Sequence, residues 1–337
     1  MDLVKSQNEI EQGHDLTQAT MRSIMDAVMT GQLQDSQVAS LLLQLRAKGE
    51  AVEEIAGAAE SLRRHMVPVE VDQSKLVDTC GTGGDASGTF NVSTAAAIVA
   101  AAAGVPIAKH GNRSVTSRTG SADVLEQLGV KIDLDAKQVA ACINQVGIGF
   151  CFAPQMHPAM KYVAKIRREL KVPTIFNLLG PLCNPAGAGF QLIGVGKKEL
   201  QPKLAAALAL LGTERSWLVH GRDGLDEITT QTETTVFEVY EGRTGCSDWH
   251  PDRFGIPVSN WNEAVVDGPE ESAAMIQNVL NGQPGVGRDL VVINAAAAIA
   301  LGRNSQAWEA CREAAEEAID SGDSKTLLNH WIEMSHS

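Results

Sequence analysis

The chain has 337 residues, of which 44% are hydrophobic and only 4% aromatic, and its formal net charge at pH 7 is -13. This length suits a large α/β domain with a smaller companion, and the scarcity of aromatic side chains requires a core of Ala, Leu, Val, Ile and Met. The negative charge argues against nucleic acid and anionic membrane surfaces as partners, because both would repel the protein as a whole.

The cysteines and the apolar stretches bear on the cellular compartment. Six cysteines are scattered without a Cys-x-x-Cys pair, and the polar start of the chain contains no signal-like apolar segment. We therefore expect reduced thiols and a cytoplasmic location. The longest apolar stretches, at residues 95–103 and 291–301, are Ala-rich and too short to span a bilayer, so the sequence predicts no membrane insertion.

Residues 1–70 carry a helical pattern and no strand pattern. Apolar residues recur at helical spacing within 21–28 and 38–45, and residues 51–66 are predicted to form a further helix. We expect a small all-α domain here, with Asp35 as the N-cap of one helix. Because short helices leave apolar faces uncovered, a second subunit is a reasonable way to bury them.

From residue 76 onward, short apolar strands alternate with Ala-rich helices, which is typical of parallel βαβ units. We therefore expect an α/β domain at residues 71–337. The predicted strands are at residues 76–78, 105–109, 148–152, 192–195, 216–220 and 235–240, and the predicted helices are at 95–103, 122–128, 202–211, 270–280, 291–301 and 305–319.

The first segment that could carry chemistry is DTCGTGGDASGTFNVST, from Asp78 to Thr94, which leaves a strand, passes four glycines and enters a helix. Backbone N–H groups of such a loop can bind phosphate groups together with the helix N-terminus. No Lys-Ser/Thr pair follows the glycines, so this is not a Walker A loop. The helix starts too late for a nicotinamide-binding loop, and the next strand ends at Lys109 rather than at an acid. On the glycines alone, a plain turn capped by Asn91 or Ser93 is equally well supported.

The second segment, residues 109–121, follows the second predicted strand, at the edge where open parallel sheets bind ligands. It brings Lys109, Arg113 and Arg118 together among hydroxyl side chains in an otherwise acidic chain. Opposite unit charges about 4 Å apart attract by roughly 1 kcal/mol in bulk water and about 4 kcal/mol at a partly buried site. A polyanion would therefore bind this loop in preference to the general surface. The alternative is a solvated connecting loop.

Two further segments carry weaker signals. Adjacent Asp226 and Glu227 follow a predicted strand, and their oxygen ligands suit Mg²⁺, although acid pairs on loops are usually just solvated. His157 and Arg167 could meet over one pocket, where the guanidinium would bind a carboxylate in bidentate fashion. The alternative is that His157 caps a turn and that the neighbouring Arg168 faces solvent.

Taken in order, these segments resemble the anthranilate phosphoribosyltransferase family over nearly the whole chain. The resemblance implies a small N-terminal all-α domain, to which about residues 160–185 contribute, and a larger α/β domain with a mostly parallel central sheet. It also implies Mg²⁺-dependent transfer of the phosphoribosyl group of 5-phosphoribosyl 1-pyrophosphate (PRPP) to the amine of anthranilate, in tryptophan biosynthesis, by a homodimer formed through the helical domain. The motifs that carry it are GTGGD at 81–85, NVST at 91–94, KHGNRS at 109–114, HPAM at 157–160, RREL at 167–170, the run 177–185 and the pair at 226–227.

The resemblance assigns roles to individual residues. Anthranilate would face Gly81, Asn112, His157 and Arg167. Mg²⁺ would be bound by Ser93, Asp226 and Glu227, and the catalytic residues would be Lys109, Asp226 and Glu227. PRPP would be bound by a larger set from both loops, namely Gly81, Gly84, Asp85, Thr89, Asn91, Val92, Ser93, Thr94, Lys109, His110, Gly111, Asn112, Arg113, Ser114, Val115, Thr116, Ser117 and Ser121.

Two other functions compete with this interpretation. Pyrimidine nucleoside phosphorylases look like relatives with a similar architecture, but they handle one phosphate without a divalent metal, so the pair Asp226 and Glu227 argues against them. A nucleic-acid-binding relative without catalysis is opposed by the net charge of -13. For the transfer we expect electrostatic catalysis and no covalent enzyme intermediate, because a well-positioned aromatic amine is a sufficient nucleophile.

Overall fold

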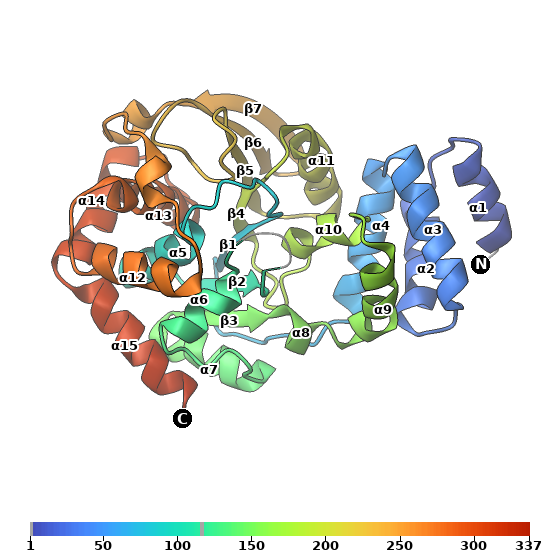
Figure 1. Cartoon of the computed structure of the whole chain (residues 1–337), viewed down its shortest axis with the longest axis horizontal. Coiled ribbons are helices and arrows are strands. Elements are labelled where there is room, and N and C mark those ends of the chain that lie inside the picture. Colours follow the sequence, from blue (N-terminus) through green and yellow to red (C-terminus); the bar gives the residue numbers. More distant parts are fainter. Residues whose placement is uncertain (1–2, 115–117) are drawn as a thin grey trace.

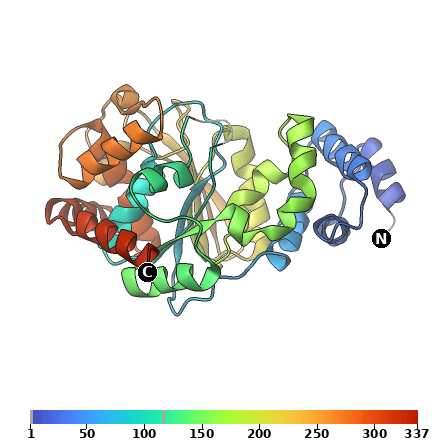
Figure 2. The ribbon, with the colours of Figure 1, turned by 60° about the horizontal axis from the view of Figure 1, so that its bottom comes forward.

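A computed structural model describes residues 3–114 and 118–337 and shows an elongated molecule with two regions. A group of helices lies at the N-terminal end, and a sheet covered by helices forms the rest (Figures 1 and 2). None of the described helices is long and apolar enough to cross a membrane.

The helical region is built from four N-terminal helices and two later ones. Ile24, Val28 and Leu41 recur at helical spacing and are buried between these helices. Asp35 was predicted to be the N-cap of α3, but it is the first residue of the helix, and Gln34 is the N-cap. The carboxylate of Asp35 still lies at the positive end of the helix. The elements are α1 (Leu3–Glu11), α2 (Gln18–Met29), α3 (Asp35–Lys48), α4 (Val52–Arg64), α9 (Lys161–Leu170) and α10 (Phe176–Leu179).

The sheet has seven strands in the order β3-β2-β1-β4-β5-β6-β7. Strands β1 to β5 are parallel, and β6 and β7 form an antiparallel hairpin at one edge. This confirms the predicted fold class, a small helical domain beside a mostly parallel sheet. The strands are β1 (Val77–Gly81), β2 (Ile107–Gly111), β3 (Ile148–Phe152), β4 (Phe190–Gly194), β5 (Arg215–Gly221), β6 (Thr234–Tyr240) and β7 (Arg243–Trp249).

The two faces of the sheet belong to two different hydrophobic cores. Successive residues of β4 and β5 alternate between them, so Leu192 and Trp217 face one core while Ile193 and Leu218 face the other. The first core is covered by α5 (Val92–Ala102) and α13 (Val286–Arg303). The second is shared by α11 (Gln201–Leu211) and the helical region. The helical region is therefore packed onto the sheet through a common core.

Some of the elements that the sequence did not predict are largely polar, whereas the helix at residues 136–146 is amphipathic and was overlooked. Strand β7 exposes residues 243–248, and α9 buries only Val163 and Ile166, so neither has the apolar pattern on which a prediction depends. The domain boundary at residue 70 stays a prediction. The remaining elements are α6 (Ser121–Gln127), α7 (Ala136–Val146), α8 (Ala153–Met156), α12 (Pro269–Leu280), α14 (Trp308–Asp320), α15 (Asp323–Ser335) and short 3₁₀ turns at Pro158–Met160, Gly180–Leu182, Lys198–Leu200, Pro251–Phe254 and Trp261–Ala264.

The packing of α4 on α2 depends on Gly57, where an added Cβ would lie 2.3 Å from the main-chain oxygen of Gln18. Alanine is favoured over glycine in a helix by about 1 kcal/mol, but overpacking against fixed atoms costs about 1–3 kcal/mol. We therefore expect Gly57→Ala to lower the melting temperature measured by calorimetry. Gly287→Ala in α13 is the matched control, because a Cβ there meets only side-chain atoms, at 3.5 Å or more. Equal stability of both variants would contradict the close-packing argument.

Candidate active site

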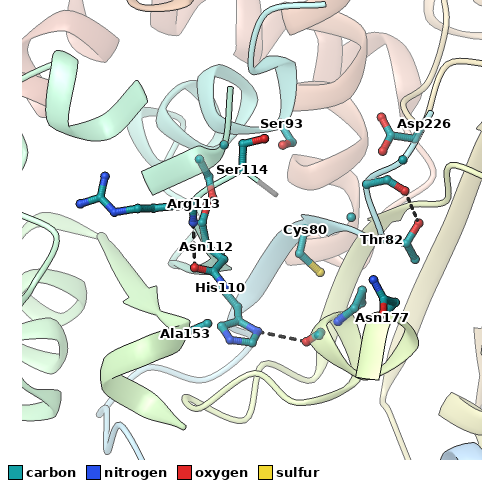
Figure 3. Close-up of a pocket in the computed structure, with 18 of the residues that line it drawn as sticks. Cys80, Thr82, Ser93, His110, Asn112, Arg113, Ser114, Ala153, Asn177 and Asp226 are labelled. Atoms are coloured by element: carbon teal, nitrogen blue, oxygen red, sulfur yellow. Dashed lines mark hydrogen bonds between the residues drawn. The ribbon is translucent and has the colours of Figure 1, made fainter. Parts of the chain in front are cut away.

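The carboxyl ends of β1, β2 and β5 open onto one cavity with a volume of about 740 Å³. Strand β1 continues into the glycine loop, β2 into the basic loop, and β5 leads to the predicted acid pair. Helices α4, α9 and α10 of the helical region line the opposite side. Figure 3 shows Ser93 and Asp226 toward one end of this cavity and His110 and Asn177 toward the other. The cavity therefore lies between the two regions of the molecule.

The glycine loop takes a conformation that requires its glycines. Gly83 and Gly84 have φ angles of 63° and 87°, in the left-handed region. The chain that leaves β4 passes close to this loop, because a Cβ on Gly196 would lie 2.5 Å from the oxygen of Gly83. The main-chain N–H of Gly196 also donates to Thr82 Oγ1 at 3.0 Å. Close contact with the neighbouring main chain thus restricts the loop.

Asn91 ties the end of the glycine loop to two distant parts of the chain. It is the N-cap residue of α5, but its side chain makes no capping hydrogen bond. Instead, its Oδ1 accepts hydrogen bonds from Ser272 Oγ at 2.8 Å and from Thr119 Oγ1 at 3.0 Å. A simple capped turn therefore does not describe Asn91. Ser272, at the start of α12, had no recognisable signal in the sequence.

Lys109 lies beneath the loop and is only 2% exposed. Its Nζ donates to the carbonyl oxygen of Thr79 and lies 3.3 Å from Ser93 Oγ. Burial lowers the pKa of Lys109, while the carboxylates of Asp78 and Glu227 act in the opposite direction. The ammonium group is thus fixed next to the acid pair.

Three carboxylates, those of Asp85, Asp226 and Glu227, interact at the cavity wall. Burial and the negative charges of Asp85 and Glu227 raise the pKa of Asp226 well above its ordinary value. Burial also raises the pKa of Glu227 to about 7, despite the nearby Lys109. Asp85 Oδ2 is buried without a hydrogen-bond partner among the described residues, whereas Glu227 Oε1 accepts a hydrogen bond from the Ser93 N–H at 3.1 Å. Carboxylates that repel each other and leave an oxygen unsatisfied fit a hard divalent cation such as Mg²⁺.

The residues that could hold such an ion do not form a complete protein cage. Within residues 3–114 and 118–337, no three His, Cys, Asp or Glu side chains stand at metal-binding spacing. Mg²⁺ usually takes one or two carboxylates and fills its shell with water and substrate phosphates. Ser93, Asp226 and Glu227 are the predicted ligands, and Asp85, predicted only for PRPP, interacts with Asp226 in the structure.

His110 and His157 form a buried pair on the cavity wall. Their Nε2 atoms are 3.1 Å apart, and His110 Nδ1 lies 3.0 Å from the carbonyl oxygen of Gly180. Because a carbonyl only accepts, His110 Nδ1 carries a proton and His157 Nε2 donates to His110 Nε2. Burial lowers the pKa of His110 to about 3 and that of His157 to about 4, so both rings are neutral at pH 7. A main-chain interaction of His157 with Cys183 opposes the effect of burial on its pKa.

Arg167 faces the same cavity from α9. Its guanidinium carbon lies 5.5 Å from the centre of the Phe176 ring, and burial lowers its pKa. In the described part of the chain, no carboxylate acts on that pKa, so the guanidinium is available to an anionic ligand. Gly81, Asn112 and His157, the other residues predicted to face anthranilate, line the cavity together with Arg167.

The two arginines of the basic loop are paired with carboxylates. Arg113 bonds to Glu126 and Asp123, and Figure 3 shows its side chain pointing away from the other labelled residues. Arg118 bonds to Asp267. The loop therefore offers less free positive charge than its composition indicated.

Most of the residues predicted to bind PRPP line this cavity. Thr94 is buried in α5 and is not part of the wall, and Val115, Thr116 and Ser117 lie outside the described residues. The sequence interpretation missed Cys80, Thr82, Lys161, Asn177 and Pro181, which also line the wall. The predicted residues in the wall are Gly81, Gly84, Asp85, Thr89, Asn91, Val92, Ser93, Lys109, His110, Gly111, Asn112, Arg113, Ser114 and Ser121.

Comparison with known proteins defines the class of this fold and site. Residues 73–325 match the model of the glycosyl transferase family a/b domain, and residues 8–66 match that of the helical bundle domain of a glycosyl transferase family. The architecture is thus that of a glycosyl-transferring enzyme.

Individual relatives identify the family more closely. The chain is 49% identical to the anthranilate phosphoribosyltransferase of Rhodopirellula baltica, over 95% of this chain and 94% of that one. The crystal structure of the Thermus thermophilus enzyme matches with a TM-score of 0.92 at 38% identity, over 100% of both chains. The chain belongs to the anthranilate phosphoribosyltransferase family.

Two of the matching structures of the Saccharomyces cerevisiae anthranilate phosphoribosyltransferase show ligands of different kinds. The complex with PRPP and Mg matches with a TM-score of 0.89 at 31% identity, over 99% of this chain and 98% of that one. The complex with 4-fluoroanthranilate matches with a TM-score of 0.88 at 29% identity, with the same coverage.

Because the two histidines are buried and neutral, we expect the protein to become less stable as the pH falls. The pKa of His157 is about 4 in the folded protein and ordinarily 6.5, so the unfolded chain binds a proton first as the pH falls. The free energy of unfolding should therefore decrease between pH 6.5 and pH 4. We expect His157→Asn to be less stable at pH 7.5 but to lose less melting temperature on going to pH 5. The exposed His330→Asn is the control and should keep the wild-type slope. Identical slopes in all three proteins would exclude His157 as the cause.

Proposed function

We propose that this chain transfers the phosphoribosyl group of PRPP to the amine of anthranilate, with Mg²⁺, as a step of tryptophan biosynthesis. The products would be N-(5-phosphoribosyl)anthranilate and pyrophosphate. The observation that carries the proposal is one cavity with a glycine loop and three carboxylates on one wall and the guanidinium of Arg167 on another. The ligands of the Saccharomyces cerevisiae structures, PRPP with Mg and 4-fluoroanthranilate, support it.

The wall that contains the acid pair suits the departure of pyrophosphate. Breaking the bond between ribose C1 and the pyrophosphate oxygen leaves positive character on the sugar and negative charge on the leaving group. Mg²⁺, held by Ser93, Asp226 and Glu227, would neutralise that negative charge. Lys109 would add a fixed positive charge under the glycine loop, and the loop N–H groups would bind phosphate oxygens.

The wall that contains Arg167 suits the aromatic acceptor. The guanidinium of Arg167 would bind the carboxylate of anthranilate, and Asn112 and His157 would face the ring. The amine nitrogen then forms the new bond to ribose C1 and releases a proton. Holding the amine in line with C1 is the second contribution to the rate, and no covalent intermediate with the enzyme is required.

We also propose a homodimer formed through the helical region. Val4 of α1 and Leu43 of α3 are 66% and 44% exposed in the single chain. A second copy that covered these helices would remove apolar surface from water.

The reaction can be tested by following the fluorescence of anthranilate after mixing the protein with PRPP and Mg²⁺. We expect the fluorescence to decrease and the decrease to stop when a chelator is added, because the carboxylates need the cation to bind the pyrophosphate group. A constant signal from folded protein would overturn the proposal and favour a nucleoside phosphorylase. Phosphate-dependent cleavage of a pyrimidine nucleoside by the same sample would then be measured.

Replacing Arg167 should affect one substrate more than the other. A hydrogen bond to a charged group contributes about 1.5–3 kcal/mol, which corresponds to about 10- to 100-fold in affinity. We expect Arg167→Ala to raise the KM for anthranilate by about this factor and to leave the KM for PRPP nearly unchanged. Arg168→Ala, the exposed neighbour, is the matched control. A larger effect on PRPP than on anthranilate would mean that the acceptor site is misplaced.

A further inference from the structure

Asn294 is a fully buried amide in the middle of α13, surrounded in sequence by alanine and β-branched residues. Asparagine is a poor helix residue, and a buried amide is tolerated only when its hydrogen-bonding groups are satisfied. The Nδ2 group of Asn294 donates to the carbonyl oxygens of Ile228 at 3.0 Å and Leu290 at 2.9 Å. Its Oδ1 accepts from the N–H of Ile228 at 3.0 Å. The side chain therefore pairs with both main-chain polar groups of one residue.

Ile228 directly follows the acid pair. It is 1% exposed, so water cannot replace these two hydrogen bonds without a movement of the chain. Residues 226–228 lie between β5 and β6, outside the ladder of the sheet, and need other contacts to fix their position. Asn294 supplies this contact from α13, which packs on β1 and β4.

The segment is also held from other sides. A Cβ on Gly194, at the end of β4, would lie 1.9 Å from the main-chain oxygen of Asp226, so the segment is in close contact with this strand. The side chain of Glu227 accepts a hydrogen bond from the Ser93 N–H at the start of α5. The hydrogen bonds of Asn294 to the N–H and carbonyl groups of Ile228, which we call the Asn294 clamp, complete this set of contacts. They oppose the repulsion between Asp226 and its acidic neighbours.

We propose that Asn294 is a positioning residue for the metal and pyrophosphate site. By pairing with both polar groups of Ile228, it fixes the main chain so that the carboxylates of Asp226 and Glu227 point into the cavity before any ligand arrives. It touches neither substrate nor metal. The inference rests on the proposed function, in which these two carboxylates bind Mg²⁺.

The loss of this clamp should weaken metal-dependent binding more than it weakens the fold. Without Asn294, two buried main-chain groups of Ile228 lose their partners, and the segment can move toward water and displace the acid pair. Residues that orient metal ligands typically change metal affinity or activity by about 10- to 100-fold when they are replaced. We expect a change of about this size in the binding of PRPP with Mg²⁺ and none in the KM for anthranilate.

The experiment is calorimetric titration of PRPP into the full-length protein at several Mg²⁺ concentrations, together with the melting temperature of each variant. Asn294→Ala should bind PRPP about 10-fold or more weakly and need more Mg²⁺. Gln201→Ala is the matched control, because Gln201 is an equally buried amide that donates to two main-chain carbonyls, of Leu218 and Thr235, away from the acid pair. It should lower the melting temperature and leave PRPP binding unchanged.

Two further variants separate the possible failures. If Asn294→Ala does not fold, Asn294→Ser takes its place, since a serine hydroxyl can still bond to the carbonyl of Leu290 but is too short for Ile228. Wild-type PRPP binding by folded Asn294→Ala or Asn294→Ser, with binding weakened in Asp226→Asn, would overturn the role of Asn294 alone. Wild-type binding by Asp226→Asn would overturn the metal site itself and with it the proposed function.

Discussion

The repulsion among Asp85, Asp226 and Glu227 is the constraint on which the rest of the site depends. Three carboxylates at a partly buried wall stay ionised together only if positive charge compensates them. Lys109 supplies part of that charge, and it cannot move away because its side chain is buried and bonded to Thr79. Burial, together with the neighbouring negative charges, still raises the pKa values of Asp226 and Glu227. A divalent cation at this wall would bind with release of protons.

The sheet explains why these groups lie together and why the wall that contains Arg167, the proposed acceptor wall, lies opposite them. Parallel strands place the chain segments that follow β1, β2 and β5 at one edge, and a glycine at position 194 lets Asp226 approach that edge closely. The second face of the sheet shares its core with the helical region, so α9 and α10 are positioned relative to the same strands. Because the cavity lies between the sheet and the helical region, its walls are built from different elements and differ in chemistry.

The features of the fold and the site that could be predicted are those with local signals. The apolar strands and the glycine-rich loop that follows the first of them depend on nearby residues, and both are visible in the sequence. Features that depend on distant contacts were not predicted. Arg113 looked like a free cation, but Glu126 and the neighbouring Asp123 neutralise it from the next helix. Asn294 was hidden in an Ala-rich run whose apolar pattern indicated only a buried helix, because its partner lies 66 residues away.

The two walls of the cavity differ in electrostatics, and this difference can orient the substrates of the proposed reaction. The histidine pair is neutral at pH 7, so the positive charge of the wall that contains α9 comes from Arg167 and Lys161. A carboxylate on the acceptor is repelled by the acid pair and attracted by Arg167, which turns the opposite side of the molecule toward the donor. Pyrophosphate would be drawn the other way, because the carboxylates proposed to bind Mg²⁺ and the glycine loop lie together on the opposite wall. The separation of charge would therefore align the amine with ribose C1 before the reacting atoms meet.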